Sequence, residues 1–522
     1  MIGTIRTKQR PLVSVVGILL VMCSGCSLKV QEKALHQPYD LAHQEGLDGK
    51  SPWLKAHLPD GGLYLLSNWQ VDDSGRQITG QGTLLDVRRD LVSSGPFVVP
   101  LDSVAIFESN IVHTSPAVAG LTILTVASLG MTAYCIANPK ACFGSCPTFY
   151  AENESGQPML MAEGFSASVA PNLEDTDLDA LYRATGAGQT FTLDMTNEAL
   201  ETHVVRHADL LLVPRPPGGK ILAAQDGTFW EATELLSPAV GRGPEGICTD
   251  LLTACDGRER YSLADSFYLG DKETLELEFE EIPEGDLGLV ISSRHSLLST
   301  YLFYQGLAYL GEKAAPALVR LGSSPQAQTG SKTLGLLLGR IEVQVPGPDG
   351  EWIFAGTTGE TGPLAVNVHM LRLPALDTTD RRLRLVLTKG NWRLDHVALA
   401  VLGNEVSPDR IAPAQVLNQG RPDPEALAKL TSTDLTLVTL PGDSFRLVYE
   451  LPETPEQWDV FLESRGYYLE WMRTEWMTEE DPIKAAMMFG YPRQALGFLA
   501  PEFKELEPDM ESHFWGSRYG SP

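Results

Sequence analysis

Residues 273–282 read "ETLELEFEEI", and their strict alternation is the clearest structural signal in the chain. Leu275, Leu277 and Phe279 form the apolar set, and Glu276, Glu278 and Glu280 form the acidic set. Successive side chains of a strand point to opposite faces, so this period of two is typical of a strand with one buried face. The stretch therefore predicts a half-buried strand whose solvent-exposed face is acidic.

Comparable strand patterns occur on both sides of this stretch. Downstream they are "LGRIEVQV", "EWIFAGTT", "LAVNVHMLRL", "RLRLVLT" and "WRLDHVALAVL". Their spacing of roughly ten to fifteen residues, with Gly and Pro between them, predicts a β-sandwich or jelly-roll-like region near Leu334–Leu402. Upstream, Leu63–Val71, Gln77–Val87 and Phe97–Ser109 are strand-like, and "DDSGR" and "SSGP" between them predict turns.

The chain has 522 residues, which is too many for a single core. We predict a mainly β, multi-domain protein with a β-sandwich or jelly-roll-like region, smaller strand modules and a few helices. The expected segments are a signal peptide (1–26), a tether (27–60), a small β module (61–112), an apolar helical segment (115–137), a β module with cysteine loops (138–265), a β-sandwich (266–403) with an inserted helix (293–321), and an α/β C-terminal tail (404–522).

Two boundaries of helices can be read from the sequence. Ser292 or Ser293 would serve as the N-cap of the inserted helix, and Gly311 would end it. Short helices are expected near Asp481–Phe489 and Pro492–Leu499 in the tail.

The N-terminus has the features of an export signal. Three basic residues precede an apolar run, Pro11–Met22, that is too short for a comfortable transmembrane helix. The run is followed by "CSGC", which resembles a bacterial lipobox and implies cleavage before Cys26 and acylation there, with palmitate among the chains attached. An ordinary secretory signal is the alternative. Ser27 stands where inner-membrane lipoproteins carry Asp, which favours the outer membrane of a Gram-negative cell envelope.

The charge of the chain excludes some classes of partner. The formal net charge is -27, and removing the three basic residues of the signal makes the mature chain more acidic still. Nucleic acid and anionic lipid surfaces are therefore not expected as partners. The membrane would be reached through the lipid anchor alone, and an envelope protein or glycan partner is left open.

Residues 117–137, "AVAGLTILTVASLGMTAYCIA", contain no charge. Their length would span a bilayer, but the flanks lack the basic cluster that orients a span. Two interpretations of these residues are open: a buried helical segment, or a segment in contact with the membrane.

Five cysteines would remain beside the lipidated one, and an exported protein is placed where disulfides persist. The C-x3-C-P of Cys142, Cys146 and Pro147 resembles the copper loop of the Sco-family copper chaperones, which would make Cys142 and Cys146 candidate metal ligands. The helix that this family has after the motif is missing here. The other reading is a disulfide among Cys142, Cys146, Cys248 and Cys255.

No motif fixes an activity. In "ETHVVRH" and the residues after it, Val204, Val205 and the apolar run Leu210–Val213 favour a strand. A spacing of four would then leave His203 and His207 on one solvated face, roughly 13 Å apart and beyond the reach of one metal ion. The sequence has no G-x-S-x-G, H-E-x-x-H, Walker A or EF-hand pattern. We therefore predict no catalytic residue, no metal site and no cofactor.

Several stretches together resemble conserved-hypothetical lipoproteins of environmental bacteria, of Bacteroidetes-like type. They are "PLDSVAIFESN", "NPKACFGSCPTFY", "AEGFSASVAPNLEDTDLDALY", "NEALETHVVRHADLLLV", "KGNWRLDHVALA" and "LESRGYYLEWMR". The resemblance implies an envelope lipoprotein and no activity. We expect a non-enzymatic binding or scaffolding role; thiol or copper handling and a hydrolase with an acidic site are the alternatives.

Overall fold

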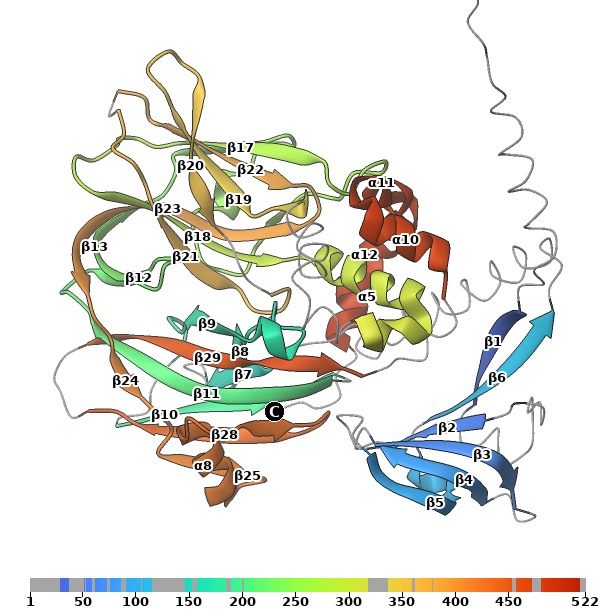
Figure 1. Ribbon diagram of the computed structural model, residues 1–522. Helices are drawn as coiled ribbons and strands as arrows, with labels where there is room; N and C mark the ends of the chain where they lie inside the picture. Colours follow the sequence, from blue (N-terminus) through green and yellow to red (C-terminus); the bar gives the residue numbers. More distant parts are fainter. Residues whose placement is uncertain are drawn as a thin grey trace, which may run out of the picture. The chain divides into compact units, whose positions relative to one another are not determined.

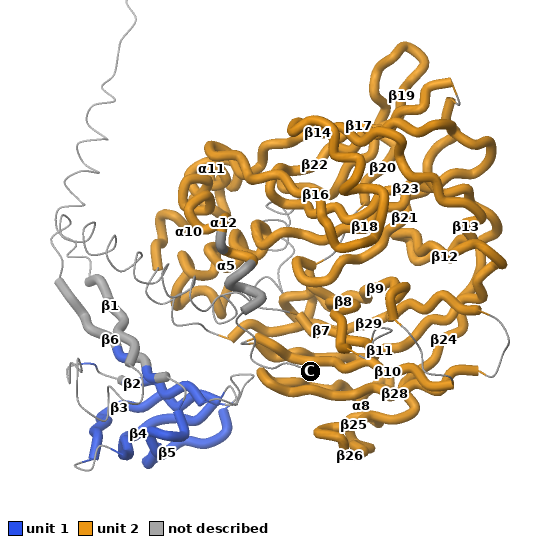
Figure 2. Tube along the Cα trace, turned by 180° about the vertical axis from the view of Figure 1, so that it is seen from behind, with its two compact units in different colours: residues 1–130 blue, residues 131–522 orange. Residues whose placement is uncertain are grey.

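A computed structural model gives the arrangement of the chain. It describes residues 29–36, 51, 53–58, 62–72, 76–85, 91–104, 106–114, 146–152, 157–184, 189–199, 201–317, 337–358, 362–377, 379–452, 457–471 and 480–516. The chain divides into two compact units, residues 1–130 and 131–522, which Figure 2 colours separately. The predicted signal peptide with Cys26, the apolar segment 117–137 and Cys142 lie outside the described residues.

The N-terminal unit is one antiparallel sheet with a small apolar core. Its strand order is β1-β6-β2-β3-β4-β5 (Figure 1). The strands are β1 (Lys29–His36), β2 (Trp53–His57), β3 (Leu63–Val71), β4 (Gln77–Leu85), β5 (Leu91–Pro100) and β6 (Ile106–Thr114). The core includes Leu54, Leu66, Ile78, Val99 and Phe107. The strands β1 and β2 lie within the segment assigned to a tether, so the sheet extends beyond the predicted module.

The connections of this sheet differ in part from the prediction. At the two described ends of "DDSGR", the Asp72 carboxylate accepts hydrogen bonds from the Arg76 and Gln77 amides at 2.9 and 3.1 Å, while residues 73–75 lie outside the described residues. "SSGP" was wrongly predicted as a turn, since Ser93 to Pro96 continue β5 and pair with β4. Gly95 allows this continuation with a φ of 147°, a conformation that few other residues adopt.

Two sheets of the C-terminal unit are built from segments far apart in the sequence. Sheet B has the order β26-β25-β28-β10-β7-β8, and sheet C has β24-β11-β29-β9 with β27 beside β11. The strands are β7 (Thr148–Glu152), β8 (Pro158–Glu163), β9 (Asp175–Ala180), β10 (Thr190–Thr196), β11 (Glu201–Pro214), β24 (Asp409–Ile411), β25 (Gln415–Asn418), β26 (Arg421–Pro422), β27 (Leu437–Thr439), β28 (Ser444–Glu450) and β29 (Trp458–Glu470). Strands of the predicted tail therefore complete the sheets of the predicted cysteine module.

Sheets B and C enclose a common apolar core. Phe149, Leu193 and Leu447 contribute from sheet B, and Leu210 and Leu462 contribute from sheet C. Figure 1 shows β11 and β29 lying over β10 and β28. The helix α8 (Pro424–Thr431) adds Ala426 and Leu430 to this core, and the Asp423 carboxylate caps the helix by accepting a hydrogen bond from the Ala426 amide.

The intervening segment forms a second sandwich. Sheet D has the order β12-β13-β23-β18-β21 with β16 beside β23, and sheet E has β15-β14-β17-β22-β19-β20. The strands are β12 (Lys220–Ala223), β13 (Phe229–Leu236), β14 (Val240–Gly243), β15 (Gly246–Ile247), β16 (Arg260–Tyr261), β17 (Lys272–Glu278), β18 (Leu287–His295), β19 (Ile341–Pro346), β20 (Trp352–Thr358), β21 (Asn367–Arg372), β22 (Arg382–Thr388) and β23 (Trp392–Val406).

The "ETLELEFEEI" prediction is confirmed in this sandwich. Leu275, Leu277 and Phe279 are buried between sheets D and E, while Glu278 is exposed on the opposite face. With five sheets and few helices, the protein is mainly β and multi-domain, as predicted.

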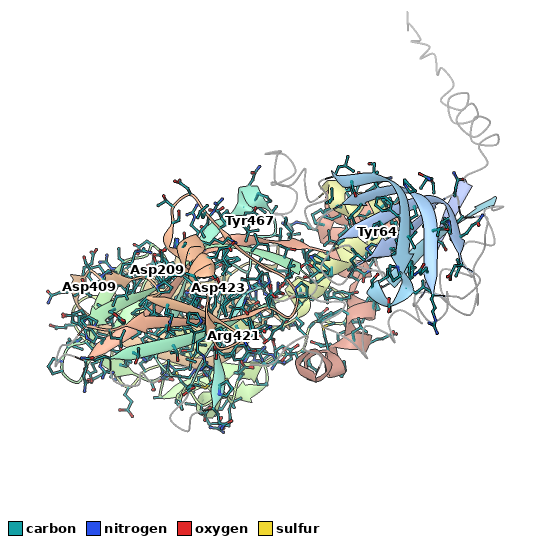
Figure 3. All side chains as sticks on the ribbon, turned by 90° about the horizontal axis from the view of Figure 1, so that it is seen from below. Tyr64, Asp209, Asp409, Arg421, Asp423 and Tyr467 are labelled. Carbon is teal, nitrogen blue, oxygen red and sulfur yellow. The ribbon has the colours of Figure 1, made fainter. Side chains whose placement is uncertain are left out.

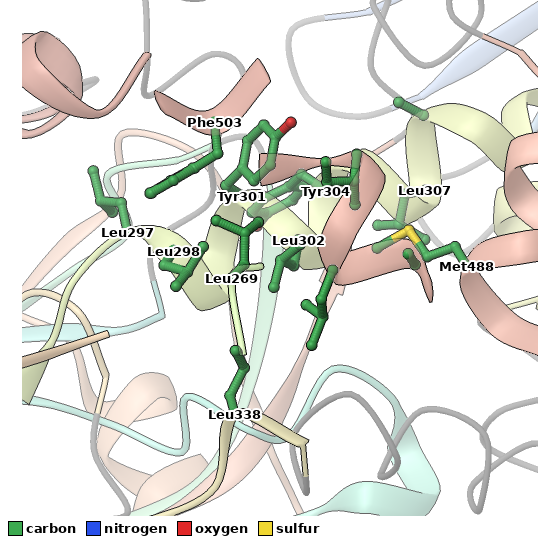
Figure 4. Close-up of a cluster of buried hydrophobic side chains, with 14 of the residues drawn as sticks. Leu269, Leu297, Leu298, Tyr301, Leu302, Tyr304, Leu307, Leu338, Met488 and Phe503 are labelled. Carbon is green, nitrogen blue, oxygen red and sulfur yellow. The ribbon is translucent and has the colours of Figure 1, made fainter. Parts of the chain in front are cut away.

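A group of helices packs beside the sheets (Figure 1). They are α5 (Leu298–Leu310), α10 (Pro482–Gly490), α11 (Pro492–Phe498) and α12 (Ala500–Gly516). Figure 4 shows their shared apolar cluster, in which Tyr301 lies against Phe503 and Met488 lies beside Leu307. The two short helices of the tail are confirmed. Within the part of the chain that the structure describes, no helix is long and apolar enough to cross a membrane.

The predicted start of the inserted helix was wrong, and of its two predicted ends, Gly311 and residue 321, the structure supports Gly311 for α5. Ser292 and Ser293 are buried in β18 and pair with β21 and β23, so they cannot cap a helix. The helix begins at Leu298, whose amide donates to the Ser296 hydroxyl at 3.1 Å. Gly311, with a φ of 51°, ends it.

Candidate functional site

The three described cysteines lie in three different environments. Cys146, Cys248 and Cys255 are free thiols, and Cys248 is therefore not joined to Cys255. Cys248 is buried, and burial together with the Glu245 carboxylate raises the pKa of its thiol. Cys255 is exposed, with its Sγ 3.7 Å from the Ser292 hydroxyl. A disulfide of Cys142 stays a prediction.

Cys146 lies immediately before β7 in a buried acidic cluster. Burial raises the pKa of its thiol well above the ordinary value, and Glu163, Glu201, Glu470 and Asp177 raise it further. The thiolate is the form that binds Cu(I) or attacks a disulfide, so these surroundings favour an unreactive thiol. The location of Cys146 therefore does not strengthen the copper interpretation.

The two histidines lie on the predicted strand but not on one face. His203 is opposite Tyr468 and His207 is opposite Arg465 across the β11–β29 ladder, with a register shift between Val205 and His207. Tyr468 and Arg465 are three positions apart on β29 and so point to opposite faces. The expectation of a shared face is therefore wrong, because a β-bulge adds one residue between the histidines.

The environment of His203 also differs from the prediction. Its ring is buried rather than solvated, and its Nε2 lies 3.1 Å from the buried Glu201 carboxylate. His207 is half-buried, with its Nε2 3.0 Å from Glu463. Each imidazole is therefore paired with a different glutamate.

The carboxylates around Cys146 join sheets B and C to their neighbours. The hydroxyl of Tyr304 in α5 donates to Glu470, and that of Tyr468 donates to the Ser166 carbonyl at 3.2 Å. Glu163 accepts a hydrogen bond from the Leu364 amide at 2.8 Å. These contacts give the carboxylates a structural role at the end of the core between the two sheets.

This cluster is not arranged as a metal centre. Among the residues that the structure describes, no group of three or more His, Cys, Asp or Glu side chains could hold a metal ion. Of the described residues that the sequence singled out, Cys146 and His203 share the neighbour Glu201 in this polar cluster, whereas Cys248, Cys255 and His207 lie in other surroundings.

A different feature stands out on the surface of the N-terminal unit. The strand β5 is the last strand in the sheet of the N-terminal unit, and β4 is the one partner that the described residues give it. Residues 91–94 are all exposed, and Leu91, Val92 and Val98 are 65%, 57% and 60% exposed. An edge strand with outward apolar side chains is a template for pairing with another chain.

This edge strand was not predicted, because "SSGP" within it favours a turn. The run "LVSSGPFVV" has two apolar residues before Gly95 and Pro96 and three after them, but Gly95 and Pro96 favour a turn locally. Residues 93–96 continue as a strand because they pair with β4, where Gly82 is opposite Gly95. Gly82 in turn lies so close to β3 that a Cβ would come 1.8 Å from the Leu65 carbonyl oxygen. The pair of glycines in β4 and β5 was the available signal.

No protein-family model matches the chain, and no curated protein matches it in sequence. Among solved structures, one of the Gx strain of infectious bursal disease virus aligns with 63% of this chain and 74% of its own at 14% identity, with a TM-score of 0.14. The secreted serine protease VesC from Vibrio cholerae aligns with 72% of this chain and 99% of its own at 9% identity, with a TM-score of 0.13. At these scores neither likeness carries an argument about fold or function.

Proposed function

We propose that this chain is a non-enzymatic binding protein of the cell envelope, held to the outer membrane by a lipid on Cys26. The lipobox-like "CSGC" supports the anchor. The exposed edge strand β5 supports the binding role and is the observation on which the proposal rests.

The partner would be a protein segment that adds an extended strand to β5. In this mode, backbone hydrogen bonds supply affinity and alternating side chains supply specificity. The exposed residues 91–94 offer free backbone groups together with Leu91 and Val92, whereas Pro96 lacks an amide hydrogen and limits the pairing beyond it. A segment of about four residues paired along Leu91–Ser94 would lie beside Leu91 and Val92, two of the three most exposed apolar residues of the strand.

Site-specific photo-crosslinking tests this proposal in the cells that make the protein. A benzophenone amino acid is placed at Val92 in one variant and at Ser67 in the other. Ser67 is the matched control because it is also exposed but lies on β3 where Trp53 of β2 and Gln81 of β4 pair with it on the two sides. We expect a discrete protein adduct from position 92 and none from position 67. No adduct at position 92, or the same adducts at both positions, would count against the proposal.

A further inference from the structure

Three carboxylates lie together where β8, β9 and β29 meet. Asp177 is directly opposite Ser464 in the β9–β29 ladder, and Asp179 is opposite Leu462, whose side chain is in the core between sheets B and C. Residues two apart on a strand share a face, so Asp177 and Asp179 both point toward that core. Glu163 at the end of β8 is the third member, and its charge acts on Asp179.

Two buried polar atoms at this place have no hydrogen-bond partner among the residues that the structure describes. One is Oδ2 of Asp179, whose residue is 3% exposed, and the other is the hydroxyl of Ser464, which is fully buried. A buried carboxylate oxygen without a partner is costly when charged and much less so when protonated. The Ser464 hydroxyl, on β29 opposite Asp177, is a second buried polar group here without a hydrogen-bond partner among the described residues.

The groups whose charges act on Asp177 and Asp179 are all acidic. Burial raises the pKa of Asp177 from 3.8 to about 6, against hydrogen bonds from the Leu178 and Phe165 amides, and Asp175 adds to the rise. Burial raises the pKa of Asp179 well above 3.8, and Asp177 and Glu163 add to the rise. Both groups therefore retain protons at a pH where ordinary carboxyls are charged.

The other elements packed here offer no compensating cation among the described residues. The facing groups are Ser464 of β29, Asn367 of β21 and the Cys146 thiol. Arg465 alternates with Ser464 and so points to the other face, where it pairs with Glu174. Arg206 pairs with the same Glu174.

The same place joins the two sandwiches of the C-terminal unit. The Asn367 side chain donates to the Leu178 carbonyl at 3.0 Å and accepts from the Ala180 amide at 3.3 Å, which fastens β21 to β9. The Glu163 carboxylate lies against Gly362, where a Cβ would come within 2.2 Å of it. Repulsion among the carboxylates would act directly on these contacts.

We propose that Asp177 and Asp179 form a proton-holding latch, which fastens β9 to β8, β29 and the segment 362–367 while the carboxyls are protonated and loosens this junction when they are charged. The folded state then binds more protons than the unfolded state between about pH 4 and about pH 6 for Asp177. Asp179 extends the window to higher pH. Stability falls as pH rises through this window, because the unfolded state binds fewer protons there.

Thermal unfolding of the full chain between pH 4.5 and pH 8 tests the latch. We expect the wild-type Tm to fall as the pH rises, apart from a background shared by all variants. Asp179→Asn mimics the protonated carboxyl, so it should flatten this fall and raise the Tm at pH 8 by at least about 2 °C. Asp409→Asn is the matched control on the exposed strand β24 (Figure 3), and it should follow the wild type.

Two results would overturn the proposal. One is a Tm profile of Asp179→Asn that keeps the wild-type slope, and the other is a lower Tm than the wild type at pH 8. Asp177→Asn provides a second variant, for which the same flattening is expected. If both amide variants fail to fold, the proposal is also overturned, because a neutral amide should be tolerated where a protonated carboxyl lies.

Discussion

A buried arginine in β16 joins the turn between β14 and β15 to β17. The Arg260 side chain is 1% exposed, and its guanidinium donates to Glu273 of β17 and to both oxygens of Glu245 at 2.8 and 2.9 Å. The Ser262 hydroxyl also donates to Glu273, at 2.7 Å. Glu273 is itself buried, so the arginine is what allows its charge to remain there.

Replacing this arginine should therefore destabilise the protein strongly. We expect Arg260→Ala to lower the free energy of unfolding by about 3–5 kcal/mol, because it leaves Glu273 buried without a counter-charge. Arg258→Ala is the control two residues away: Arg258 pairs with Asp256 at the surface, and its loss should have no measurable effect. Urea unfolding of both variants measures the difference, and equal losses would refute this view of the buried network.

At the scale of elements, the last helix is fastened to sheet D by two glutamates. Glu507 accepts hydrogen bonds from the Tyr261 hydroxyl at 2.8 Å and the Ala264 amide at 2.7 Å. One turn further on, Glu511 pairs with Arg294 at 3.1 Å and Arg393 at 2.6 Å. The acidic face of α12 is thus part of the C-terminal unit's packing.

Removing Glu507 should loosen this helix. Glu507→Ala leaves the Ala264 amide and the Tyr261 hydroxyl without their acceptor, and we expect a loss of about 1–3 kcal/mol in the free energy of unfolding. Limited proteolysis should then cut within residues 500–516 faster than in the wild type. Glu505→Ala is the control, since Glu505 is exposed on the same helix. Equal cleavage of the two variants would show that Glu507 does not anchor α12.

Elements with a strong local pattern could be predicted from the sequence. The alternation in β17 and the helices α10 and α11 are of this kind, as is the end of α5 at Gly311. The start of α5 could not, because Ser292 and Ser293 have good capping chemistry yet are held in a strand by pairing with β21 and β23. Tertiary pairing overrides a local preference in such cases.

At the scale of the whole molecule, the mainly β class was predictable but the composition of the sheets was not. Strand β29 lies some 250 residues after β11, and the two form the long ladder of sheet C. No local pattern reports which distant strands pair. Prediction of the candidate site was limited in the same way. The thiols and histidines are visible in the sequence, but the burial of Cys146 and the bulge between His203 and His207 are not.

The proposed role depends on the whole chain being tethered in the cell envelope. A lipid on Cys26 would hold both units at a membrane and place β5 among envelope proteins. Without the anchor, neither the compartment nor the expected partner follows. The acidic charge of the chain gives it no electrostatic attraction to an anionic membrane, so the lipid would have to supply the attachment.

Mass spectrometry of the N-terminal peptide from the mature protein tests this claim most directly, with Cys26→Ser as the comparison. We expect the wild-type peptide to begin at Cys26 with a mass increased by acyl chains, and the protein to fractionate with the outer membrane. The Cys26→Ser protein should lack the lipid and leave the membrane fraction. An unmodified Cys26, or a wild-type N-terminus elsewhere, would contradict the account.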